Sequence, residues 1–159
     1  MITNRLVINK IHSVMRKKFL EVFKALGFEM EEMEIGYGFH YEGKHYLYMP
    51  NDEDEDFLNI TLPAVLDIDD ENNVSFYQLM DKINGTLKYV EANIFNDSMW
   101  LFYERELIDD EDLKQVIFRM ILHLESGFMF LHRAMAASDE TESDSEEMVD
   151  ALDDKEDVA

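Results

Sequence analysis

Alternating apolar and polar residues between Met33 and Val65 constrain the fold of this chain more than any other feature. From Met33 to Tyr41 the odd positions carry large apolar or aromatic side chains, and the even positions carry Glu, Gly and His. Such alternation is typical of a strand with one buried face. Glu42-Gly43 then separates this run from a second one, and glycine provides the positive φ that a two-residue hairpin turn needs. The pattern predicts the first two strands of an antiparallel meander.

The turn at Glu42-Gly43 fixes which side chains of these two strands lie opposite each other. It places Tyr41 opposite Lys44 and His40 opposite His45. Since opposite side chains share a face of the sheet, one face is expected to be aromatic. That face comprises Tyr37, Phe39, Tyr41, Tyr46 and Tyr48, and the other comprises Gly36, Gly38, His40, His45, Leu47 and Met49.

The third strand of the meander is predicted at FLNITLPAV, residues 57–65. Its apolar residues alternate again, with Leu58, Ile60 and Leu62 on one side. Pro63 has no N–H group to donate to a neighbouring strand, which favours a sheet edge or a strand end at that point.

Three helices and a hairpin complete the expected fold. Residues 8–26 repeat apolar side chains every three or four positions, as an amphipathic helix does, and Gly27 follows at the expected C-cap. A short helix is expected at residues 74–84, and a β-hairpin at residues 87–104 turns at Asn96-Asp97. The short helix is expected to bury Val74, Tyr77, Met80 and Ile83, and a long helix from about residue 109 to 137 is expected to bury Leu113, Ile117, Met120, Leu124, Phe128, Leu131 and Met135.

The predicted fold class is therefore α+β, in the order helix, three-strand antiparallel meander, short helix, β-hairpin and long C-terminal helix. Residues 1–137 are expected to form a single domain. Residues 138–159 contain 11 acidic residues and one lysine, a local net charge of −10. Because acidic segments that are poor in aromatic residues rarely bury a core, residues 138–159 are predicted to form a disordered tail.

Charge and composition exclude several classes of function. A formal net charge of −22 repels phosphates, which argues against nucleic-acid binding. The chain contains no cysteine and no apolar run of transmembrane length, so we expect a cytoplasmic protein without membrane contact. There is no nucleophile elbow, no Gly-rich phosphate loop and no HExxH motif, so we expect neither an enzyme nor a cofactor.

The long helix carries a second apolar row, and packing of the first row against the core would not bury it. Phe118, Leu122 and Met129 lie nearly opposite the core-facing row, and Trp100 and Phe102 lie on one face of the last strand. A helix that is apolar on two sides must bury both. An adjacent loop or the tail could cover the second row, or the row could form a dimer or partner surface. The five residues are the predicted partner or dimer surface.

Two weaker features allow other interpretations. Lys10, Lys17 and Lys24 recur every seven residues on the first helix, either as a solvated face or as a surface for an acidic partner, including the protein's own tail. His40 and His45 could supply two ligands of a metal site, although zinc takes three or four. A metal- or small-ligand-binding regulator, using these histidines or the acidic loops around residues 52–56 and 67–71, is therefore the alternative function.

The element order, the amphipathic first helix, FLNITLPAV and the closing helix resemble the type III secretion chaperone-like fold. They also resemble bacterial proteins of the YbjN type, a group of candidate sensory transduction regulators. The resemblance spans residues 8–137, and the acidic tail departs from it. It implies a dimeric, non-enzymatic protein-binding module that uses no cofactor. The leading hypothesis is therefore a homodimer that binds a protein partner through apolar helix and sheet surfaces.

Overall fold

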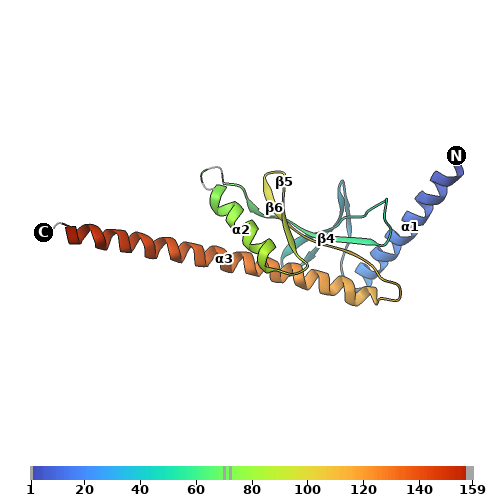
Figure 1. The fold of residues 1–159 in the computed structure, drawn as a ribbon. Coiled ribbons are helices and arrows are strands. Elements are labelled where there is room, and N and C mark those ends of the chain that lie inside the picture. The colour runs from blue at the N-terminus through green and yellow to red at the C-terminus, as the bar shows by residue number, and fades with distance from the viewer. Residues whose placement is uncertain (1, 70, 72, 157–159) are drawn as a thin grey trace.

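A computed structural model gives the fold of the chain (Figure 1). It describes the backbone of residues 2–69, 71 and 73–156 and the side chains of residues 14–69, 71 and 73–139. Within these residues three helices accompany a six-stranded antiparallel sheet, so the α+β prediction is confirmed. The elements are α1 (Ile2–Ala25), β1 (Glu31–Met33), β2 (Gly36–Tyr41), β3 (Lys44–Tyr48), β4 (Phe57–Asp67), α2 (Asn73–Thr86), β5 (Glu91–Phe95), β6 (Ser98–Glu106) and α3 (Leu113–Glu156).

The strands are ordered β1-β2-β3-β4-β6-β5. The predicted register across the first hairpin is confirmed, with Tyr41 opposite Lys44 and His40 opposite His45. Its turn has positive φ at both residues, 49° at Glu42 and 73° at Gly43. The turn at Asn96-Asp97 does the same, with φ of 50° and 60°. Two consecutive positive φ angles match the twist of the flanking strands, which is why these dipeptides join strands so tightly.

The run that begins at Met33 contains an additional turn. Met33 belongs to the short strand β1, which folds back onto β2 so that Met33 lies opposite Gly36. Gly36 has a φ of 157°, and a Cβ atom added there would collide with the carbonyl oxygen of Tyr48. Only glycine allows this close approach of two backbones. The chain therefore adds a strand that the alternating pattern does not reveal.

Pro63 lies neither at a sheet edge nor at a strand end, so the prediction of one or the other was wrong. It belongs to β4, which lies between β3 and β6 in the sheet. The register between β4 and β6 shifts between Leu62 and Leu66, which marks a bulge, and Ala64 has a φ of 49°. Because residues in a bulge do not donate regularly to the neighbouring strand, the missing N–H of a proline costs little there.

The aromatic face of the sheet is the covered face. Phe19 and Phe23 of α1 pack on it, with ring centroids of Phe23 5.1 Å from Phe39 and 5.3 Å from Tyr48. After Gly27, whose φ is 95°, the N–H of Phe28 bonds to the carbonyl of Phe23. This is a Schellman motif, and it ends α1 at the predicted glycine.

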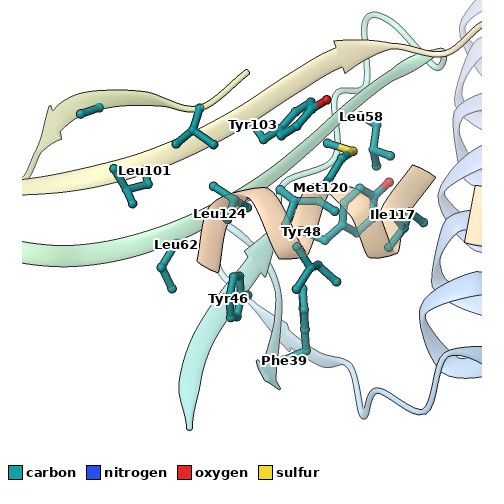
Figure 2. Packing of buried hydrophobic residues seen from close by; sticks show 14 of the residues in the cluster. Phe39, Tyr46, Tyr48, Leu58, Leu62, Leu101, Tyr103, Ile117, Met120 and Leu124 are labelled. Atoms are coloured by element: carbon teal, nitrogen blue, oxygen red, sulfur yellow. The ribbon is translucent and has the colours of Figure 1, made fainter. Parts of the chain in front are cut away.

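The core-facing row of α3, which we call the inner row, covers the remainder of that face. Figure 2 shows Ile117, Met120 and Leu124 facing side chains from the strands. These three residues are at most 1% exposed, which confirms the predicted core-facing row. The cluster around them includes Tyr46, Tyr48, Leu58, Leu62, Leu101 and Tyr103.

The predicted buried row of α2 was partly wrong. Ile83 is fully buried, but Val74 is 68% and Tyr77 50% exposed. Residues three apart advance by about 300° around a helix, so a row with that spacing drifts by about 60° at each step. Val74 and Ile83 consequently lie on opposite sides of α2. Phe76, which is 3% exposed, buries the N-terminal turn instead.

The helix α3 continues well past residue 137. Its 44 residues correspond to a length of about 66 Å, and Figure 1 shows its C-terminal part extending beyond the sheet and α2. The side chains of residues 140–156 are outside the described part, so the domain boundary at 137 and the disordered tail stay predictions. Within the described residues, no helix combines the length and apolar character needed to cross a bilayer.

Candidate interaction surfaces

Three apolar side chains on α3 face solvent and form what we call the α3 strip. Phe118 and Leu122 are each 39% exposed, and Met129 is 51% exposed. These are the helix residues that the sequence predicts for a partner surface. Their spacing of four and seven residues places them on one side of the helix. The described residues leave the α3 strip accessible.

The α3 strip borders the hairpin of β2 and β3. The ring of Phe118 meets that of Tyr41 edge to face, with centroids 6.3 Å apart. Lys44 Nζ lies 3.3 Å from a carboxylate oxygen of Glu125 and 5.0 Å from the ring centre of Phe128. Because Lys44 neutralises Glu125, the one acidic residue of α3 between residues 113 and 137 presents little free negative charge.

The charge along α3 also differs from that of the whole chain. Between residues 113 and 137 the helix carries Lys114, Arg119 and Arg133 against the single acid Glu125. The chain as a whole carries a formal charge of −22. Residues 113–137 of α3 therefore carry a formal charge of +2 on a strongly negative protein, which reduces repulsion between this helix and an acidic surface.

Trp100 and Phe102 lie on the opposite face of the sheet from α3. Successive side chains of a strand point to opposite faces, and Tyr103 of β6 contacts His123 of α3 with ring centroids 5.9 Å apart. Trp100 is only 8% exposed because Phe95 and Phe102 pack against it, at 4.7 and 6.2 Å. The structure therefore does not bring these two residues together with the α3 strip.

The face of the sheet opposite α3 also holds a polar row. Thr61 is fully buried and Asn59 is 9% exposed, and the Thr61 hydroxyl donates to Asn59 Oδ1 at 2.9 Å. The Asn59 side-chain amide donates to Glu104 Oε1, also at 2.9 Å. Burial, together with the charge of Glu91, raises the pKa of Glu104 above its usual value. A partner on this face would have to match polar groups as well as aromatic rings.

The two histidines of the predicted metal alternative meet across the hairpin. The ring centroids of His40 and His45 are 4.8 Å apart, with the planes nearly perpendicular. The described residues contain no group of three or more His, Cys, Asp or Glu side chains arranged to hold a metal ion. Two histidines are fewer than the three or four protein ligands of zinc sites.

The acidic loop at residues 51–56 is organised by its own backbone. Asn51 Oδ1 accepts the N–H groups of Glu53 and Asp54 at 2.9 and 3.2 Å. Asp54 Oδ1 accepts the N–H of Asp56 at 3.2 Å, and Asp52 pairs with Arg16. These are turn-forming contacts of Asn and Asp side chains. They account for the polar composition of the loop through local structure.

Lys17 and Lys24 of α1 line a groove of about 560 Å³ between α1 and the first two strands. Lys17 and Lys24 are exposed there, and the side chain of Lys10 lies outside the described residues. Glu21, Glu29 and Glu32 line the same groove. The groove therefore mixes charges of both signs, and the structure does not single out an acidic ligand for it.

A polar pocket of about 410 Å³ lies on another side of α3, and the sequence analysis missed it. Its residues are separated by up to 34 positions and follow no common spacing, so only the fold brings them together. The lining side chains are those of Tyr89, Tyr103, Arg105, Glu111, Asp112, Gln115, Val116, Arg119 and His123.

Comparison with known proteins shows a similarity of fold and no similarity of sequence family. No protein-family model matches it, and no curated protein matches it. Among solved structures it is similar to YbjN from E. coli, which is described as a candidate transcription regulator. The two chains are 11% identical, the TM-score is 0.55, and the match covers 77% of this chain and 92% of YbjN. At this identity the likeness shows the fold alone, and it confirms the YbjN-type resemblance at that level.

Proposed function

We propose that this protein is a non-enzymatic, regulatory protein-binding module that associates with a second copy of itself through the α3 strip. The exposure of Phe118, Leu122 and Met129 on a helix whose inner row packs on the sheet supports this most directly. Contiguous exposed apolar side chains with a polar rim are typical of protein–protein contacts. The proposal requires no cofactor and no contact with nucleic acid or membrane.

The spacing of the α3 strip suits a two-fold symmetric contact. If two α3 helices cross antiparallel near residues 123–124, Phe118 of one copy faces Met129 of the other, and the two Leu122 side chains lie near the axis. Methionine sulfur packs favourably against aromatic rings. A two-fold contact pairs one patch with itself, and the α3 strip satisfies that requirement.

Charge favours the same surface for association. Two copies with a net charge of −22 each repel one another over most of their surfaces. The helix that bears the α3 strip carries three basic residues and one neutralised acid between residues 113 and 137. Association at this helix therefore avoids the strongest repulsion. The aromatic residues around Trp100 stay free for a different protein partner.

A regulatory role is proposed from the fold alone. YbjN, described as a candidate transcription regulator, shares the fold, and a shared fold by itself does not fix a function. A dimer with a free sheet face is suited to binding another protein rather than to catalysis. Pull-down of partners with the full chain, and with a Phe102→Glu variant, tests whether that face is used.

Light scattering after size-exclusion chromatography tests the dimer. We expect the wild-type chain to have the mass of two copies and Leu122→Glu to have the mass of one. Val74→Glu is the matched control, because Val74 is an exposed apolar helix residue on α2. It should remain a dimer. A wild-type monomer at high protein concentration, unchanged by Leu122→Glu, would contradict the proposal.

A further inference from the structure

The polar pocket beside α3 has an aromatic wall made from three elements. Tyr89, between α2 and β5, stacks on Tyr103 of β6 with ring centroids 5.7 Å apart and planes 9° from parallel. His123 of α3 contacts both rings, at 5.3 and 5.9 Å. Tyr103 is 8% exposed and Tyr89 is 62% exposed. The wall is therefore fixed at its base and open at Tyr89.

The backbone of Tyr89 is held in an unfavourable conformation. Its φ is 71°, in the left-handed region that bulky residues rarely adopt. Strained residues of this kind concentrate at ligand sites, where the surrounding structure over-determines them. Glycine or asparagine would adopt that backbone conformation more readily. The turn alone therefore does not explain why a tyrosine occupies position 89.

The two acids of the pocket already have partners. Glu111 accepts two hydrogen bonds from Arg105, at 2.6 and 2.7 Å, and one from the N–H of Ile108 at 2.8 Å. The Ile108 N–H and Arg105 hold the pKa of Glu111 below its usual value. Asp112 caps α3 by accepting the N–H groups of residues 114 and 115, at 3.1 and 3.4 Å.

Two further polar side chains of the pocket, Arg119 and His123, have no hydrogen-bond partner within the described residues. Arg119 makes no hydrogen bond or ion pair within the described residues, and its guanidinium offers five donors in a plane. His123 makes ring contacts but no hydrogen bond there either. Because Arg105 is bound to Glu111, Arg119 is the basic side chain of the pocket that no carboxylate binds within the described residues. The backbone N–H groups at the start of α3 stabilise the charge of Asp112 without cancelling it.

We propose that this pocket binds a small planar organic anion, with its carboxylate on Arg119 and its flat body against Tyr89 and His123. Guanidinium and carboxylate form paired, charge-assisted hydrogen bonds. Aromatic side chains stack on planar groups more favourably than on saturated ones. The volume of the pocket, about 410 Å³, is within the range of small-molecule sites. This binding function is additional to the proposed dimer.

An NMR titration of the full ¹⁵N-labelled chain with sodium benzoate tests this proposal. A ligand of this size is expected to bind in the millimolar range, so the titration extends to about 50 mM. Sodium cyclohexanecarboxylate keeps the charge but is not planar, and benzamide is planar but uncharged. We expect saturable shifts for benzoate at the amides of residues 115–123. Each comparison compound should bind about fivefold or more weakly.

Two variants locate the binding. Arg119→Gln should abolish saturable shifts, while Arg133→Gln, which removes the same charge from α3 outside the pocket, should leave them unchanged. Tyr89→Gly should lose binding without losing thermal stability, because it removes the ring and the backbone strain together. The proposal is overturned if benzoate gives no saturable shift, if Arg119→Gln and Tyr89→Gly bind as the wild type does, or if inorganic phosphate binds more tightly than benzoate.

Discussion

The inner row of α3 and the α3 strip consist of similar side chains in very different surroundings. Ile117, Met120 and Leu124 are at most 1% exposed, whereas Phe118, Leu122 and Met129 are 39–51% exposed. Both sets contain large apolar residues on the same few turns of one helix. Position around the helix axis, rather than residue type, decides which set packs on the sheet. The comparison separates residues that stabilise the fold from residues that are available for association.

The energetic difference follows from the partners of each row. The inner row contacts side chains from β3, β4 and β6 in one cluster. Fully burying a side chain of this size contributes about 1.5–3 kcal/mol to stability. The α3 strip has an edge contact between Phe118 and Tyr41, and 39–51% of the surface of its three residues stays exposed within the described residues.

The largest expected effect distinguishes two leucines two positions apart. Leu124→Ala should lower the free energy of unfolding by about 2–5 kcal/mol, because it leaves a cavity in the core. Leu122→Ala should change it by less than about 0.5 kcal/mol. Urea unfolding at low protein concentration, where association contributes little, measures both. Equal losses for the two variants would contradict the assignment of the two rows.

The next largest expected effect is a difference in stability between substitutions at Gly127 and at its neighbour Ser126. A Cβ atom at Gly127 would lie 3.2 Å from Val90 Cγ1 and 3.5 Å from Leu101 Cδ1. Gly127→Leu should therefore overpack the core and destabilise the chain by about 1–3 kcal/mol. Ser126→Leu, on the exposed side, should change stability by less than about 0.5 kcal/mol. Thermal unfolding of both variants checks this, and a stable Gly127→Leu variant would be evidence against close helix–sheet packing there.

A smaller effect is expected on association alone. Met129→Ala removes part of the apolar contact in the proposed dimer, which should weaken it by about 1 kcal/mol, or about fivefold. The unfolding of the monomer should not change, since Met129 is 51% exposed. Sedimentation equilibrium gives the dissociation constant. A dimer of unchanged affinity would place the interface elsewhere.

The smallest expected effect is a pH-dependent change in stability at Glu111, which precedes the first residue of α3. Because the folded state lowers the pKa of Glu111, this residue stabilises the fold above its unfolded-state pKa of about 4.3. That stabilisation is lost as the pH falls through the lower, folded-state pKa. Glu111→Gln should therefore reduce the melting temperature at pH 7, and the difference should shrink below about pH 4. A difference that does not vary with pH would rule out the charge as its source.

Local patterns explain which predictions the structure confirms. The register across Glu42-Gly43 depends on one turn and on alternation, both of which act over a few residues. The inner row of α3 keeps the helical period over several turns, so the sequence alone predicted which side of the helix is buried. The α2 row failed at Val74 and Tyr77 because a spacing of three drifts around the helix. Short patterns with the wrong period do not define a face.

The amino-acid sequence by itself determined the order of the elements apart from β1, the register of the first hairpin, the inner row of α3 and the candidate α3 strip. Each of these depends on periodicity or on a turn between neighbours. Only the tertiary structure decided that Pro63 lies in a central strand and that Trp100 faces away from α3. It alone assembled the pocket between Tyr89 and Arg119. Those features depend on how distant segments pack, and side-chain spacing along the chain carries no information about that packing.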